Sequence, residues 1–255
     1  MAALSARSLS DLPEVRAGDD LAALIAAALD AERPSGGLRN GEIVAIAHKI
    51  VSKAEGAVVA LGGIVPSARA REIAAQQGKD PRAVQVVLDQ SQEVLRAERG
   101  VLICRTHHGF VCANAGVDAS NAPDSNTVIA LPADPDASAR RLRARLRELT
   151  GARAAVLIAD SFGRAWRHGQ CDVAIGCAGL VALDDWRGRA DGAGRQLHAT
   201  WLAVADAAAA AADLVRAKDS REPVAILTGL ERFVTAEDGP GAAALLRRHQ
   251  EDLFR

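Results

Sequence analysis

The amino-acid sequence predicts a fold that combines α-helices with β-strands, and two kinds of hydrophobic pattern support this. Residues 42–47 alternate in the manner of a strand, and the apolar run at residues 154–159 has the length of a single buried strand. Between residues 21 and 29, by contrast, apolar side chains recur at the spacing of one helix face. An alanine-rich stretch at residues 203–217, with an acid on either side of its central alanines, also indicates a helix.

Capping and turn residues mark the ends of the predicted elements. Asp19 and Asp20 suit the first turn of the first helix, where the helix dipole favours negative charge. Ser67 is a typical N-cap, and Arg99-Gly100 suits the turn of a hairpin. We expect further helices at 67–77, 82–88 and 137–149, a polar helix from about residue 237 onward, and strands at 93–98, 101–106, 181–186, 197–202 and 223–228.

Composition excludes several classes of protein. The formal net charge of −1 over 255 residues argues against recruitment of nucleic acid or a membrane surface by bulk charge. No run approaches the roughly 18 apolar residues of a membrane span, and the N-terminus has no cleavable apolar core. The four cysteines show no CxxC spacing, which favours reduced, structural thiols in a cytoplasmic protein.

The stretch at residues 154–176 is the first candidate site. Its apolar run is expected to end as a strand at Asp160-Ser161, which offers a carboxylate and a hydroxyl on rigid backbone. Hard divalent cations prefer such oxygen ligands. Arg164 and Arg167 follow, and both suit the handling of an anion. The alternative is a strand ending in an Asx turn beside a solvated arginine pair.

Two other stretches carry candidate ligands. Residues 110–121 form a second apolar run, and within it Asp118 and Asn121 offer oxygen and amide contacts beside small residues that let a ligand approach the backbone. Residues 48–56, which include His48 and Lys53, follow a predicted strand and have side chains suited to cradling phosphates. For this last stretch the favoured alternative is a surface helix turn.

Several of these stretches together resemble the coenzyme F420-0:L-glutamate ligase family, also called F420:gamma-glutamyl ligase. The longest matching strings are HGFVCANAGVDASN at residues 108–121 and DSFGRAWRHGQ at residues 160–170. Shorter strings match in the family's order: LPEVRAGDDL (12–21), IVSKAEG (50–56), GKDPR (78–82), LPADPDASARRLR (131–143) and AVADAAAAAADLV (203–215).

The resemblance implies an unusual two-lobed α+β fold in an intertwined, cytoplasmic homodimer. Residues 1–255 would form one ligase unit of two interleaved lobes, without the nitroreductase-like C-terminal domain of some relatives and therefore without bound flavin. The implied enzyme adds L-glutamate to the carboxylate tail of coenzyme F420-0, with gamma-linked glutamates able to follow. It uses GTP and two divalent cations, Mg²⁺ or Mn²⁺, assisted by K⁺, and releases GDP and phosphate.

The family's functional residues fall on specific positions of this chain. The metal ligands fall on Asp118, Asp160 and Ser161, and the guanine-nucleotide contacts fall on Leu12, Pro13, Glu14, Val15, His48, Lys53, Asn121, Lys218 and Val224. The chain departs from the family's pattern at five positions. Ser161 and Cys171 stand for threonine, His48 for glutamine or serine, Ala207 for glutamate and Ala217 for glycine.

The expected chemistry is formation of an acyl phosphate from GTP and the acceptor carboxylate, followed by attack of the glutamate amine. We assign catalytic roles to Asp118, Asp160, Arg164 and Arg167, of which the two acids hold cations that neutralise charge and the two arginines hold the acceptor. Two alternatives remain at this point. One is a metal-dependent phosphohydrolase, and the other is a non-catalytic nucleotide-binding relative.

Overall fold

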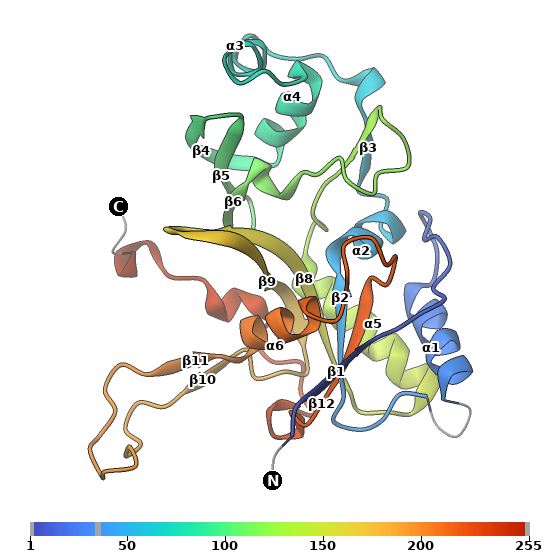
Figure 1. The fold of residues 1–255 in the computed structure, drawn as a ribbon, viewed down its shortest axis with the longest axis vertical. Coiled ribbons are helices and arrows are strands. Elements are labelled where there is room, and N and C mark those ends of the chain that lie inside the picture. Colours follow the sequence, from blue (N-terminus) through green and yellow to red (C-terminus); the bar gives the residue numbers. More distant parts are fainter. Residues whose placement is uncertain (1–2, 34–36, 253–255) are drawn as a thin grey trace.

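A computed structural model describes residues 3–33 and 37–252, and it confirms the predicted mixture of helices and strands in several sheets (Figure 1). The largest sheet has five strands in the order β1-β12-β2-β8-β9. Their bounds are β1 Ser5–Ser8, β2 Ile43–Ala47, β8 Ala155–Arg164, β9 Arg167–Ala178 and β12 Val224–Thr228. Strands β2 and β8 pair in parallel, whereas the other neighbours are antiparallel.

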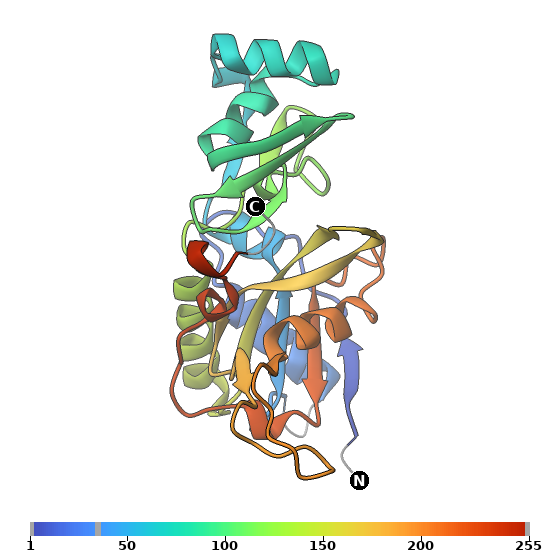
Figure 2. The same ribbon diagram turned by 90° about the vertical axis from the view of Figure 1, so that its left-hand side faces the viewer.

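The five-stranded sheet is covered on both faces. Successive side chains of a strand point to opposite faces, so β2, β12 and residues 155–159 of β8 need apolar side chains on both faces. One face packs against α1 (Leu21–Glu32), α2 (His48–Ala54) and α5 (Pro135–Thr150), and the other packs against the alanines of α6 (Val204–Asp213). Figure 2 shows the sheet between α5 on one side and α6 on the other.

Local signals explain where the helices begin and end. The Asp20 carboxylate accepts a hydrogen bond from the amide of Ala23 at the start of α1, and Asp134 does the same for Ala137 in α5. Gly151 ends α5 in the left-handed conformation that glycine adopts without strain. The predicted Ser67 cap is confirmed at α3 (Ala68–Gln77).

Residues 58–129 form a separate part of the molecule, which we call the small-sheet region. It contains the pair β3 (Val58–Ala60) and β7 (Thr127–Ile129), a three-stranded sheet of β4 (Ser91–Glu98), β5 (Val101–Thr106) and β6 (Val111–Ala113), and the helices α3 and α4 (Pro81–Asp89). It has its own apolar cluster and lies above the five-stranded sheet in Figure 1. We call the remaining described residues the central region.

The prediction that the strand of the first candidate site ends at Asp160 was wrong. Strand β8 continues to Arg164 because β9 supplies a hydrogen-bonding partner along its full length, with Ser161 opposite Asp172 and Phe162 opposite Cys171. The outer ends of β8 and β9 extend beyond the sheet as a two-stranded ribbon (Figure 1). Asp160 therefore lies within a strand, where the sheet passes into the ribbon.

The predicted polar helix from about residue 237 was also wrong. The described part of this segment contains only two short 3-10 turns, at Ala242–Leu245 and His249–Glu251. The carboxylate of Asp136 on α5 accepts hydrogen bonds from the amides of Ala242 and Ala243, which fixes the segment in an irregular path. Gly241 permits this approach, because a Cβ there would lie 2.3 Å from Asp136 Oδ2.

The last predicted strands and helix are shorter than the sequence indicates. Strands β10 (Leu183–Asp185) and β11 (Trp201–Ala203) pair at the base of a long arm that projects from the central region (Figure 1). The alanine-rich helix ends at Asp213 rather than at residue 217. No helix among the described residues is long and apolar enough to cross a membrane.

Candidate functional site

The candidate site lies where the parallel strands β2 and β8 run side by side in the same direction. Their last paired residues are Ala47 and Ala159. The residues that follow this last pair therefore lie at the same edge of the sheet. They are His48, the first residue of α2, and Asp160 of β8. The Nε2 atom of His48 lies 3.3 Å from Oδ1 of Asp160.

The His48 ring is held inside the protein. Its side chain is only 2% exposed, and its Nδ1 lies 3.2 Å from the hydroxyl of Ser52 one helical turn later. Its Nε2 makes no hydrogen bond with any described residue, despite its closeness to Asp160. A buried polar atom without a hydrogen bond lowers the stability of the folded protein, so the position of Nε2 needs an explanation.

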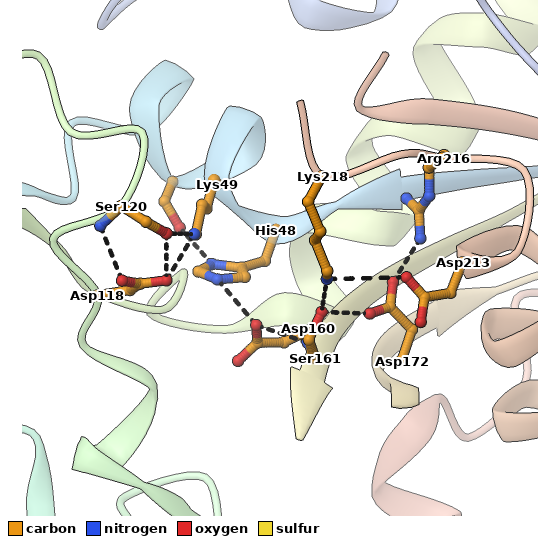
Figure 3. Close-up of polar contacts among 11 residues, drawn as sticks. His48, Lys49, Asp118, Ser120, Asp160, Ser161, Asp172, Asp213, Arg216 and Lys218 are labelled. Atoms are coloured by element: carbon orange, nitrogen blue, oxygen red, sulfur yellow. Dashed lines mark hydrogen bonds and ion pairs between the residues drawn. The ribbon is translucent and has the colours of Figure 1, made fainter. Parts of the chain in front are cut away.

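Asp118 comes from the small-sheet region and meets the residue that follows His48. The ammonium of Lys49 donates to Oδ2 of Asp118 at 2.6 Å and also contacts the hydroxyl of Ser120 (Figure 3). The amide and the hydroxyl of Ser120 donate to the same carboxylate. Burial raises the pKa of Asp118, but these hydrogen bonds outweigh it and leave the pKa below its ordinary value.

Ser161 lies on the opposite face of the ribbon from Asp160, within a second polar cluster. Its hydroxyl donates to Oδ1 of Asp172 across the β8–β9 pair at 2.5 Å and accepts from the ammonium of Lys218 at 2.6 Å. Arg216 donates to the other oxygen of Asp172, and both side chains of this ion pair are 6% exposed. Burial raises the pKa of Asp172 and lowers that of Arg216.

These donors fit a divalent cation in their chemistry. Carboxylate and hydroxyl oxygens of Asp118, Asp160 and Ser161 suit hard ions, and the hydrogen-bond-free Nε2 of His48 adds a nitrogen donor beside Asp160. Within residues 3–33 and 37–252, however, no three or more histidine, cysteine or acidic side chains gather closely enough to hold a metal by themselves. Asp118 and Asp160 instead contact the consecutive residues Lys49 and His48 from two sides (Figure 3).

The expected nucleotide-binding residues fall into three groups. Glu14 accepts a hydrogen bond from the buried Lys53, which joins the segment of Leu12, Pro13, Glu14 and Val15 to α2. Asn121 follows Ser120 in a left-handed conformation (φ 57°), close to Asp118 along the chain. Lys218 lies in the cluster around Ser161.

Val224 is placed differently, because its side chain is fully buried in β12 opposite Ile46. It therefore presents no side-chain surface to a nucleotide.

Arg164 and Arg167 are not brought to the carboxylates. They pair at the outer end of the β8–β9 ribbon, where Arg164 donates to the carbonyl of His168 at 2.6 Å. Four residues along a strand separate Arg164 from Asp160, which corresponds to about 13 Å. The two arginines are exposed, so they form a separate basic end of the ribbon.

Reasoning from sequence missed three residues of the site. Ser120, Asp172 and Arg216 each contact an expected site residue in the structure. Lys49, which contacts Asp118, lies in the stretch 48–56 that the sequence indicated for phosphates. The signal for Ser120 was present, because a polar residue two positions after an aspartate often closes an Asx turn. Asp172 and Arg216 carried no local signal, since their pairing joins β9 to the segment after α6.

Comparisons with known proteins agree with one another. The family described as F420-0:Gamma-glutamyl ligase matches residues 10–229 of the chain. The coenzyme F420:L-glutamate ligase of Methanopyrus kandleri is 46% identical over 244 residues, which covers 95% of this chain and 94% of that protein. The proteins of the same name from Methanothermobacter thermautotrophicus and Methanocaldococcus jannaschii are 44% and 42% identical, over 99% and 86% of both chains in each pair.

Proposed function

The chain belongs to the F420-0:gamma-glutamyl ligase family, and we propose that it is the GTP-dependent ligase that joins L-glutamate to the carboxylate tail of coenzyme F420-0. Gamma-linked glutamates can follow the first. The observation that carries the proposal is the convergence of the two regions on α2. Asp118 from one region and Asp160 from the other contact the consecutive residues Lys49 and His48.

The reaction needs an activated carboxylate, because hydroxide is a very poor leaving group. We propose that the acceptor carboxylate oxygen attacks the γ-phosphorus of GTP, so that GDP leaves and an acyl phosphate forms. The amine of glutamate then attacks the acyl carbon, phosphate leaves with the bonding electron pair, and the amine loses a proton. Water must be kept from the acyl phosphate during this sequence, since hydrolysis would waste GTP.

Asp118, Asp160 and Ser161 would hold the two divalent cations, Mg²⁺ or Mn²⁺, and K⁺ is proposed as an assisting ion. When bound, divalent cations supply the positive charge that lets a carboxylate approach a triphosphate. Lys49 and Lys218 already contact the proposed ligands Asp118 and Ser161, so their ammonium groups are placed to share in neutralising phosphate charge.

The nucleotide and the acceptor are assigned to different surfaces. We propose that GTP contacts the segment of Leu12, Pro13, Glu14 and Val15 together with His48, Lys53, Asn121 and Lys218, with Val224 supporting them from the core. Arg164 and Arg167 on the ribbon would hold an anionic group of the acceptor. Their distance from Asp160 suits a long substrate whose reacting carboxylate lies far from its other charges.

We further propose that the protein works in the cytoplasm as an intertwined homodimer of two-lobed subunits. Trp166 at the end of the ribbon is 83% exposed, and Trp201 and Leu202 at the base of the arm are 47% and 42% exposed. Large apolar side chains on projecting hairpins are characteristic of surfaces that become buried in an interface.

The test is mass spectrometry of the deazaflavin product after incubation with GTP, L-glutamate and Mg²⁺ or Mn²⁺. We expect a mass gain of one or more glutamates together with glutamate-dependent GDP release. Asp160→Ala should abolish both, whereas Asp191→Ala, an exposed aspartate in the arm, should leave both unchanged. GDP release that needs only water would indicate a phosphohydrolase, and GTP binding without turnover would indicate a non-catalytic relative.

A further inference from the structure

The Nε2 atom of His48 is a buried nitrogen that faces a carboxylate without bonding to it. The side chain is 2% exposed and the atom lies 3.3 Å from Oδ1 of Asp160, yet no hydrogen bond joins them. A ring N–H at this position is not aligned with the oxygen beside it, and a lone pair there is directed the same way. A positive ion lying off the line between the two atoms is therefore able to contact both the Nε2 lone pair and the carboxylate.

The other ring nitrogen has a partner that is able to accept its proton. Nδ1 lies 3.2 Å from the hydroxyl oxygen of Ser52, which is fully buried on the same helix. If Nδ1 carries the proton and donates it to Ser52, Nε2 is left as a basic lone pair. Histidines that bind metals almost always donate their second ring N–H to a protein acceptor in this way.

The separation of the two atoms also matches that of two ligands on one ion. Metal–ligand bonds of about 2.1 Å that meet at right angles place neighbouring ligand atoms about 3 Å apart. The distance of 3.3 Å between Nε2 and Oδ1 is close to this value. Because β2 and β8 are hydrogen-bonded neighbours, the backbone already holds the pair at this spacing.

We propose that His48 Nε2 is a direct ligand of a divalent cation shared with Asp160, and that it makes the site prefer a transition ion such as Mn²⁺ to Mg²⁺. Imidazole nitrogen is a good ligand for first-row transition ions, whereas Mg²⁺ is bound almost entirely through oxygen. The proposed function supplies the role of the cation in the reaction, whereas the identity of its ligands does not depend on that function. The preference is specific to this chain if the family has glutamine or serine at the position of His48, as the resemblance implies.

Pulsed electron paramagnetic resonance of the full-length protein loaded with Mn²⁺ alone tests the coordination directly. We expect nuclear modulation from one bound imidazole ¹⁴N, replaced by the ¹⁵N pattern when the protein is made with ¹⁵N-histidine. This measurement needs no variant and no catalytic activity. Bound Mn²⁺ without histidine modulation would overturn the inference, and so would the absence of Mn²⁺ binding.

Variants measure the preference between ions. His48→Gln should remove the imidazole signal and weaken Mn²⁺ binding by about tenfold or more. Mg²⁺ affinity, measured by competition with Mn²⁺, should change much less. The matched control is His107→Gln, because His107 lies in an exposed turn outside the site, where its Nε2 is 3.0 Å from the carbonyl of Asp89. An equal loss of affinity for both ions in His48→Gln would contradict the proposed selectivity.

The ligase assay separates this inference from the proposed function. If glutamate is added to the deazaflavin while Mn²⁺ shows no histidine modulation, the nitrogen ligand is wrong and the ligase assignment stands. If the modulation is present but no amide product forms with any divalent ion, the metal site stands and the ligase assignment fails.

Discussion

The central region and the small-sheet region differ in how much apolar surface they bury, although both supply residues of the candidate site. Strands β2 and β12 of the central region are buried along almost their whole length, with helices on both faces of the sheet. Strand β4 of the small-sheet region, by contrast, has no fully buried residue, and Leu95, Val101 and Val111 on its sheet are 40–50% exposed. Burial of apolar surface is the main source of stability, so the central region is expected to be the more stable of the two.

The residues of the candidate site therefore come from two regions of different expected stability. His48, Asp160 and Ser161 lie at the edge of the five-stranded sheet, whereas Asp118 and Ser120 belong to the small-sheet region. The connections include the Lys49–Asp118 ion pair and the edge-on packing of Phe110 against Phe162, whose ring centroids are 6.2 Å apart. The site is therefore complete only while the small-sheet region is docked.

The largest effect is expected from the buried ion pair of the central region. Arg216→Ala leaves Asp172 buried without its partner and should lower the free energy of unfolding by about 3–5 kcal/mol, measured by chemical denaturation. The double variant Arg216→Met with Asp172→Leu removes both charges and should recover most of this loss. If the double variant is as unstable as the single one, the ion pair is not the cause.

Two matched leucines test whether the regions unfold separately. Leu157 in β8 and Leu102 in β5 are both 0% exposed, and replacing either with alanine should cost about 2–5 kcal/mol. Hydrogen exchange should show that the two variants affect different lengths of the chain. Leu157→Ala should speed exchange throughout the chain, whereas Leu102→Ala should speed it mainly in residues 58–129. Identical exchange patterns would show that the two regions unfold as one unit.

A smaller effect is expected at the contact between the regions. The pKa of Asp118 is lower in the folded protein than its ordinary value of 3.8, so the ionised carboxylate stabilises docking above that pH. This stabilisation should be lost as the pH falls through the folded pKa. The ion pair is partly exposed and is expected to contribute under about 1 kcal/mol.

Hydrogen exchange around residue 118 between pH 5 and 3 measures this loss. Asp118→Asn should show less dependence on pH across the same range. A variant with unchanged dependence would mean that other carboxylates control docking.

The smallest effect on stability is expected at the end of the ribbon. Arg164 is exposed and donates only to the carbonyl of His168 among the described residues, so Arg164→Ala should change the free energy of unfolding by no more than about 0.5 kcal/mol. The KM for the acceptor should nevertheless rise by about tenfold, because a charged hydrogen bond to substrate is lost. Arg195→Ala in the arm is the control, and an unchanged KM in Arg164→Ala would remove this arginine from the acceptor site.

Sequence reasoning succeeded where the determining interactions are local. The N-cap at Ser67, the turn at Arg99-Gly100 and the buried strand at 42–47 depend on residues a few positions apart, and each was found. The continuation of β8 past Asp160 depends on pairing with β9, and the path of the last residues depends on Asp136, which is distant in sequence. The pairing of Arg216 with Asp172 is equally non-local. Contacts between residues so distant in the chain leave no periodic pattern in the sequence from which they could be predicted.

The paired strands β3 and β7 connect the small-sheet region to the central region. The chain leaves the central region at Ala57 and returns at Ala130, whose amide donates to the Ala57 carbonyl at 3.0 Å. Residues 58–129 thus have the arrangement of an insertion whose two ends meet. Excising them and joining Ala57 to Ala130 through a short turn would leave the five-stranded sheet with its helices on both faces. The shortened protein would keep His48 and Asp160 but lose Asp118, so it would show what these two residues bind without the second carboxylate.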